Sequence, residues 1–201
     1  MLPKANTTEE QIMDAAYSVF IEKGYDNAKM QHIADKAGIK RTALNYYFRS
    51  KDSLYRQTSK RIIHQALPNL LKILNSELPF EKKVSDFVES YITLAMKNPF
   101  LQLFIINEIY KVEMTIDRMV EEFKPEIHNF LKQIEQEIAK GKILNINPIQ
   151  IHLHLISLCI FPIVAKPMMM FITNMNENQY KSIIEERKNE ITRLFLKGIK
   201  P

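Results

Sequence analysis

Residues 30–48, MQHIADKAGIKRTALNYYF, decide the fold of this 201-residue chain. Apolar residues recur at helical spacing on both sides of Gly38, which predicts two short helices at about 28–37 and 40–47. Ala34 is small enough to let these helices cross closely, and Gly38 suits the left-handed backbone of a tight turn. Ile39 and Leu44 would anchor the second helix to the core. The stretch therefore predicts a helix-turn-helix.

The flanking sequence predicts helices on both sides of this stretch. Thr7 or Thr8 can cap a first helix that ends at Gly24, and Ser50 can cap a long helix over about 51–74. Apolar patterns punctuated by prolines predict further helices at about 80–97, 99–112, 115–140, 148–171 and 177–199. The chain has only 4 glycines and no alternating β-branched runs, so we expect an all-α protein with about nine helices. We expect two domains, a three-helix domain at 1–50 and a helical bundle at 51–201.

Basic charge gathers around the helix-turn-helix. The whole chain carries a formal charge of +5. Between residues 36 and 61, however, eight lysines and arginines accompany a single acidic residue, Asp52. Such a concentration is typical of a surface that binds a polyanion, although a charge run can also be no more than a solvated face. Beside the helix-turn-helix, it predicts that residues 1–50 bind double-stranded DNA.

The cysteine content and the apolar stretches indicate a compartment. Cys159 is the only cysteine and cannot form an internal disulfide, and the first residues lack the apolar run of a signal peptide. The most apolar stretch, residues 153–173, contains His154, Lys166 and two prolines, which argue against a membrane span. We therefore expect a cytoplasmic protein without a membrane partner.

The N-terminal motifs resemble the signature of the TetR regulators. The matching residues are Ala15-Ala16, Phe20, Lys23-Gly24-Tyr25, Ile33-Ala34, Ala37-Gly38-Ile39, Leu44, Tyr47-Phe48 and Ser50-Lys51-Asp52-Ser53-Leu54. The resemblance covers roughly residues 8–56. It implies a nine-helix homodimer, joined through the last two helices at about 148–171 and 177–199. It also implies a ligand pocket in the C-terminal body.

The second helix of the motif departs from the family pattern where it would meet DNA. Lys40 stands at a position that is usually Ser, Thr42-Ala43 replaces the usual Gly-Thr, and Asn45 replaces the usual Tyr. Arginine can grip guanine and asparagine can grip adenine, so we expect Arg41, Thr42 and Asn45 to read bases. The residues expected to bind phosphates are Lys40, Tyr46, Tyr47 and Lys51, with Lys29 and Gln31 flanking them. Tyr47 or Phe48 has the alternative of filling the domain core.

The C-terminal body carries less specific signals. Methionine and phenylalanine are plentiful there and can line an adaptable apolar pocket, although at helical spacing they can equally be plain core. The expected lining set is Met96, Phe100, Phe104, Met119, Phe123 and Ile127. His152 and His154 lie about 200° apart on a helix and cannot share one metal ion. No phosphate loop, nucleophile elbow or ligand spacing is present, so we expect no cofactor, no metal and no enzyme activity.

These observations predict a sequence-specific transcriptional regulator. The expected mechanism is repression at a palindromic DNA site. Repression is relieved when a small apolar or amphipathic effector shifts the dimer to a state with a different spacing of its DNA-binding domains. The sequence leaves the identity of the effector unknown. A second hypothesis is a structural or adaptor protein that binds DNA without an effector.

Overall fold

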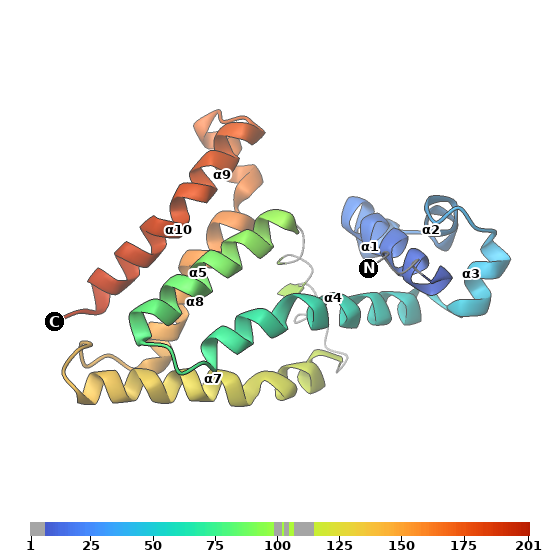
Figure 1. The fold of residues 1–201 in the computed structure, drawn as a ribbon. Helices are drawn as coiled ribbons and strands as arrows, with labels where there is room; N and C mark the ends of the chain where they lie inside the picture. Colours follow the sequence, from blue (N-terminus) through green and yellow to red (C-terminus); the bar gives the residue numbers. More distant parts are fainter. Residues whose placement is uncertain (1–6, 99–101, 103–104, 107–114) are drawn as a thin grey trace, which may run out of the picture. The chain divides into compact units, whose positions relative to one another are not determined.

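The computed structural model describes residues 7–98, 102, 105, 106 and 115–201. Within these ranges all regular secondary structure is α-helical, which confirms the all-α prediction (Figure 1). The nine described helices are α1 (Thr8–Asn27), α2 (Met30–Lys36), α3 (Arg41–Tyr47), α4 (Lys51–Leu74), α5 (Phe80–Lys97), α7 (Thr115–Ala139), α8 (Pro148–Val164), α9 (Lys166–Thr173) and α10 (Glu177–Ile199). The helix predicted at 99–112 falls mostly outside the described residues.

The chain packs as two compact units, Met1–Gln65 and Ala66–Pro201. The first unit thus extends beyond the domain boundary that we expected at residue 50. The reason is that the first half of α4 completes the core of the first unit. Leu54 and Tyr55 are buried there, and the Tyr55 ring meets Phe20 edge to face with 4.8 Å between centroids. The assignment of DNA binding to residues 1–50, and of ligand binding and dimerisation to residues 51–201, stays a prediction.

The first unit is built from short helices with well-defined ends. A capping box closes the start of α1: the Thr7 side chain accepts from the Glu10 N–H, and Glu10 accepts from the Thr7 N–H. The chain leaves helical geometry at Gly24, where φ is 72°. The expected helix end at Gly24 is therefore a kink, because a further turn continues to Asn27. Ile12 and Ala16 of α1 are fully buried. Together with buried residues of α2, α3 and the first half of α4, they form one apolar core.

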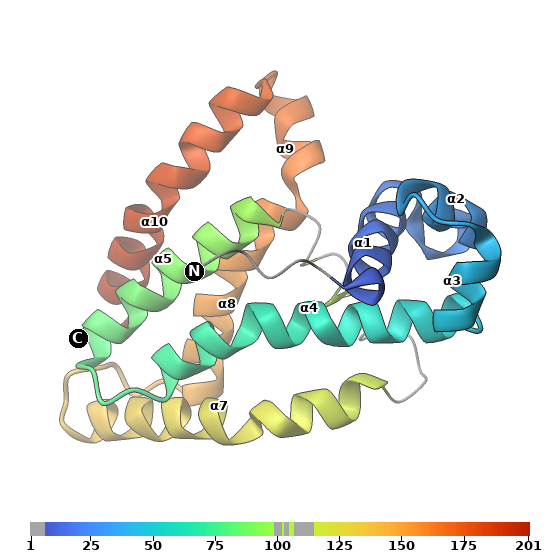
Figure 2. The same ribbon diagram turned by 45° about the vertical axis from the view of Figure 1, so that its right-hand side comes forward.

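The second unit is a bundle in which α10 packs along α5 and also contacts α8 (Figures 1 and 2). Its core is formed by buried residues of α5, α7, α8 and α10, among them Ile92, Phe130, Leu155 and Ile191. Capping side chains again mark the helix starts. Asn147 caps α8, and Asn176 forms a capping box with Gln179 at the start of α10.

The helix predicted over 148–171 is wrong as a single element. It runs through Pro162 and breaks at Ala165, and the following α9 is bent by 65° from α8. Pro167 explains where the second helix begins, since proline lacks an N–H but suits the first turn of a helix. No single helix in the described part is long and apolar enough to cross a membrane, although the bent pair α8 and α9 together passes that test of length and composition.

Candidate DNA-binding interface

The helix-turn-helix forms as the sequence predicts. Between α2 and α3, the Ile39 N–H donates to Ala34 O at 3.0 Å and the Gly38 N–H donates to Asp35 O at 3.1 Å. Gly38 has a φ of 68°, the left-handed conformation that a side chain disfavours. A Cβ built there would have no atom within 4 Å, so the turn requires glycine for its conformation and not for space.

The second helix of the motif, α3, has one buried face and one exposed face. Leu44 is fully buried, and Phe48 directly after the helix is 1% exposed. These two residues fix α3 to the core of the first unit. The predicted contact residues on the other face are exposed: Lys40, Arg41, Thr42, Asn45, Tyr46 and Tyr47. The helix therefore presents a polar and basic surface to solvent.

The two tyrosines of α3 answer the alternative that the sequence left open. Phe48 fills the core, whereas Tyr46 is 83% exposed and Tyr47 is 42% exposed. Their rings meet edge to face with 5.5 Å between centroids. An exposed tyrosine pair beside basic residues can donate hydroxyl hydrogen bonds to phosphate oxygens.

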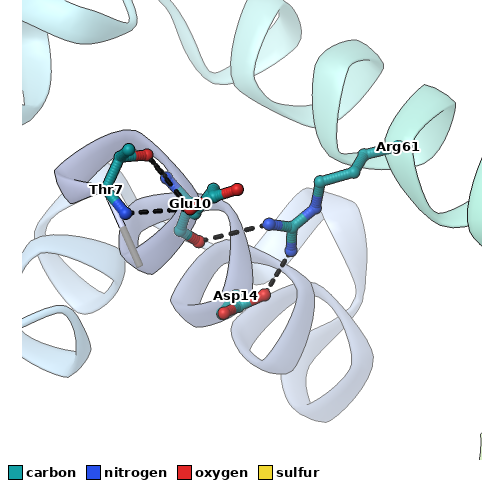
Figure 3. A network of polar contacts seen from close by, with 4 residues as sticks. All are labelled: Thr7, Glu10, Asp14 and Arg61. Carbon is teal, nitrogen blue, oxygen red and sulfur yellow. Dashed lines mark hydrogen bonds and ion pairs between the residues drawn. The ribbon is translucent and has the colours of Figure 1, made fainter. Parts of the chain in front are cut away.

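Ion pairs reduce the basic charge that the sequence indicates. Lys36 pairs with Glu22 of α1, and Arg61 of α4 pairs with Asp14 of α1. Arg61 also donates to Glu10 O at 3.3 Å, so that it joins α4 to the capped start of α1 (Figure 3). These two cations stabilise contacts between helices, and Glu22 and Asp14 compete with a polyanion for them.

Lys51 also has a structural role. Its ammonium donates to Tyr25 O at 2.9 Å and to Asp26 O at 3.3 Å, and it lies 4.3 Å from the centroid of the Tyr25 ring. The Tyr25 hydroxyl in turn donates to Asp52. Burial and the Asp52 carboxylate raise the pKa of Tyr25 to about 12, which keeps that hydroxyl protonated. The phosphate contact expected of Lys51 stays a prediction, and it competes with this contact to the end of α1.

Three exposed cations around α3 have no ion-pair partner among the described residues: Lys40, Arg41 and Arg49. Arg49 belongs to the basic run over residues 36–61, but it is not among the DNA contacts predicted from the sequence. Its position directly after Phe48 places it at the end of α3, and that proximity was the available signal. Of the flanking candidates, Lys29 is exposed before α2, while the Gln31 amide donates to Asp35 at 2.7 Å.

The expected ligand-lining set is not assembled by the described residues. Met96 and Ile127 are half-buried on α5 and α7. Phe100 and Phe104 lie outside the described residues, and so do the side chains of Met119 and Phe123. A cavity of about 340 Å³ does border Met96, between the ends of α5 and α8 and the start of α10.

The apolar residues of α10 divide between two environments. Tyr180, Ile184, Ile191 and Phe195 are buried in the second unit, so these residues pack on the body of their own chain, and the dimer contact expected of the last two helices stays a prediction. Other apolar residues remain exposed within that unit, on α8 at Ile149, Leu153 and Phe161 and on α10 at Ile183 and Leu194.

His152 and His154 lie in different surroundings. His152 is half-buried with its ring 5.9 Å from that of Phe130, and burial lowers its pKa. His154 is exposed. Within the described ranges, no three His, Cys, Asp or Glu residues are grouped in a way that could hold a metal ion.

Comparison with known proteins identifies relatives of this architecture. A family model described as "Bacterial regulatory proteins, tetR family" matches residues 12–58. The "Biofilm operon icaADBC HTH-type negative transcriptional regulator IcaR" of Staphylococcus aureus (strain Newman) is 28% identical over 133 residues. That alignment covers 66% of this chain and 66% of that protein, so the chain spans just under two thirds of its relative.

Two solved structures share the fold over nearly the whole chain. The putative transcriptional regulator SCO4942 from Streptomyces coelicolor has a TM-score of 0.70 at 14% identity, covering 97% of this chain and 100% of that one. The transcriptional regulator FadR from Bacillus subtilis in complex with stearoyl-CoA has a TM-score of 0.66 at 16% identity, covering 94% and 98%. At these identities the likeness shows the fold alone.

Proposed function

The chain belongs to the TetR family of bacterial regulatory proteins, and from that premise we propose that it represses transcription at a palindromic DNA site until a small ligand releases it. Membership confirms the family expected from the N-terminal motifs. The family consists of DNA-binding transcriptional regulators and not of enzymes, which agrees with the function predicted from the sequence. Repression is supported by the relative from Staphylococcus aureus, whose name describes a negative regulator.

The exposed face of α3 is the observation that carries this proposal. A helix held by Leu44 and Phe48 turns Arg41 and Asn45 outward, on a surface that carries unpaired basic charge. Arginine binds O6 and N7 of guanine in a bidentate manner, and asparagine binds N6 and N7 of adenine. Lys40 and Arg49 at the two ends of α3 are suited to phosphates, and such contacts set the position of the helix without reading sequence.

Dimerisation is the second part of the proposal. The exposed apolar residues of α8 and α10 are suited to cover the same face of a second copy around a two-fold axis. Charged residues of both signs, Arg187, Glu190 and Arg193, share the outer groove of α10 with Ile183 and Leu194. A face of mixed sign can meet its own copy with opposite charges opposed. Such a dimer would place two copies of α3 in successive major grooves, about 34–36 Å apart.

Ligand control is the third part. An apolar or amphipathic molecule in the second unit would favour a dimer with a different spacing of the two α3 helices, and DNA affinity would fall by the ligand's preference for that state. The complex of the FadR neighbour with stearoyl-CoA supports a ligand with an apolar part. The set of Met96, Phe100, Phe104, Met119, Phe123 and Ile127 is retained as the candidate lining. A regulator of this kind acts in the cytoplasm, where its DNA is.

Footprinting on the DNA upstream of the chain's own gene tests the proposal. We expect Arg41→Ala to lose about 1–3 kcal/mol of specific binding and to relax the preference at one base position in each half-site. Lys132→Ala, which removes an exposed charge from α7, is the matched control and should bind like the wild type. A wild-type footprint from Arg41→Ala would contradict the assignment of α3. Binding without any compound that releases the protein would favour the structural or adaptor alternative.

A further inference from the structure

A cavity of about 340 Å³ lies within the second unit, where the last turns of α5 and α8 meet the start of α9 and the first turns of α10. This volume falls at the lower end of the range of small-molecule sites, about 300–1,000 Å³. Of the lining set expected from the sequence, only Met96 borders it. The cavity opens to solvent, so a ligand can enter without unfolding a helix.

The floor of the cavity is apolar. Ala95, Ile163, Tyr180 and Ile184 line it, and each of them is less than a tenth exposed. The Tyr180 hydroxyl donates to Pro162 O, so its hydrogen is already used and the ring is what remains for a ligand. Such a floor favours the apolar body of a ligand through burial alone.

The rim of the cavity is polar and carries an excess of positive charge. Lys166, Lys181 and Glu177 contribute two positive charges and one negative charge. Lys166 and Glu177 pair with each other at 2.6 Å. Lys181 is exposed and has no hydrogen-bond or ion-pair partner in the part of the chain that the structure describes. The positive end of the α10 dipole lies on the same side, since Glu177 is the first residue of that helix.

We propose that this cavity binds a small amphipathic carboxylate, with its apolar body on Ile163, Tyr180 and Ile184 and its carboxylate beside Lys181. A cation is disfavoured by the two lysines, and a neutral apolar molecule leaves Lys181 without a counter-charge. Lys166 is a second partner for the carboxylate, but Glu177 competes for it. The inference deepens the proposed function, on which it rests only for the idea that the bound molecule is the effector.

The test uses octanoate and octan-1-ol as matched probes, titrated into the full chain without DNA. The methyl groups of isoleucine and methionine, labelled for NMR, report where each probe binds and how tightly. We expect octanoate to shift the signals of Met96, Ile163 and Ile184, while Ile149 at the start of α8 stays unchanged. Shifts confined to other methyl groups, or no shift up to millimolar octanoate, would overturn the proposal.

Two substitutions of opposite sign separate a binding role from a structural one. Lys181→Met should weaken octanoate binding about fivefold, the upper range for an exposed charge pair. Glu177→Gln frees Lys166 and should strengthen octanoate binding by a factor of about two to five. Lys132→Met on α7 should leave the octanoate affinity unchanged. The affinity for octan-1-ol should stay the same in all three variants. Octanoate affinity that is insensitive to both substitutions would refute the assigned carboxylate position.

A separate DNA-release experiment keeps the two proposals apart. If octanoate binds with the expected pattern but leaves the protein on DNA, the cavity stands and its use as the effector site fails. If another compound releases DNA from the wild type and from Lys181→Met equally, the proposed function stands and the effector acts elsewhere.

Discussion

Replacement of Arg49 by alanine tests whether the basic residues without ion pairs, and not the ion-paired ones, contact DNA. Lys36 and Arg49 belong to the same basic run, but Lys36 is paired with Glu22 whereas Arg49 is exposed and has no ion-pair partner among the described residues. The sequence alone gives the two residues equal weight. The structure predicts that Arg49 neutralises a phosphate and that Lys36 does not.

The magnitude follows from counterion release. Each phosphate contact on B-DNA contributes about 0.9 to the slope of log affinity against log salt concentration. A dimer presents Arg49 twice, so Arg49→Ala should make the slope shallower by about 1.8. The advantage of the wild type over the variant should then shrink about tenfold between 50 and 200 mM salt. Lys36→Ala removes the same charge and should leave the slope unchanged.

Fluorescence anisotropy on two duplexes measures both quantities. One duplex carries the protected upstream sequence and the other a scrambled version. Because a phosphate contact carries no sequence information, Arg49→Ala should weaken binding to both by similar factors. An equal slope change in Lys36→Ala and Arg49→Ala would refute the sorting by ion pairs. A change of only about 0.9 would mean that a single α3 engages the DNA, which contradicts the proposed dimer.

Three further predictions concern the fold, the interior and the proposed dimer. Gly38→Ala should destabilise the protein by about 1–2 kcal/mol in urea unfolding, since Gly38 has φ of 68°. Gly198→Ala inside α10 should instead stabilise the protein by up to about 1 kcal/mol. A change of the same sign at the two sites would contradict the conformational argument. Lys83 is buried and donates to Leu74 O at 2.9 Å, and burial lowers its pKa, although Glu77 opposes the shift. The unfolded chain therefore holds that proton more tightly, so the free energy of unfolding should rise as the pH approaches the ordinary lysine value near 10.5 from below, and Lys83→Met should lose that rise in pH-dependent urea titrations. Leu194→Glu should raise the dimer dissociation constant at least about tenfold in sedimentation experiments, because it replaces an exposed apolar contact by a charge in both copies, while circular dichroism stays unchanged. An intact dimer would place the interface elsewhere.

The sequence predicts the first unit well because its signals are local. Thr7 with Glu10 and Ala34 with Gly38 are pairs that lie within four residues of each other. Capping and turn chemistry act over that range, so a pattern in the sequence is enough to place the start of α1 and the turn between α2 and α3. The break at Ala165 was not predicted, because two prolines lie close to it and only one of them opens a new helix. Pro162 looks like the stronger break, but Pro167 can open a new helix and thereby sets where the old one ends.

The sequence cannot sort the basic residues, because their partners are distant along the chain. Lys36 finds Glu22 on another helix, and Arg61 finds Asp14, which lies 47 positions away. A count of charges in a window treats each lysine as available. Only the packing of α1 against α2 and α4 shows that Lys36 and Arg61 are paired, whereas Lys40, Arg41 and Arg49 at the two ends of α3 have no ion-pair partner among the described residues. The narrower set is a sharper hypothesis for DNA contact than the basic run itself.

The residues of the proposed dimer face can be identified only after the buried apolar residues of α10 are excluded. On α10 the sequence shows one broad apolar stripe, and both a core and an interface would produce it. The fold removes Tyr180, Ile184, Ile191 and Phe195 by burying them, which leaves Ile183 and Leu194 uncovered. An apolar residue that its own chain fails to cover is the one whose replacement should change assembly without changing the fold. Leu194→Glu is therefore a test of the interface, whereas the same change at Ile191 would test only the core.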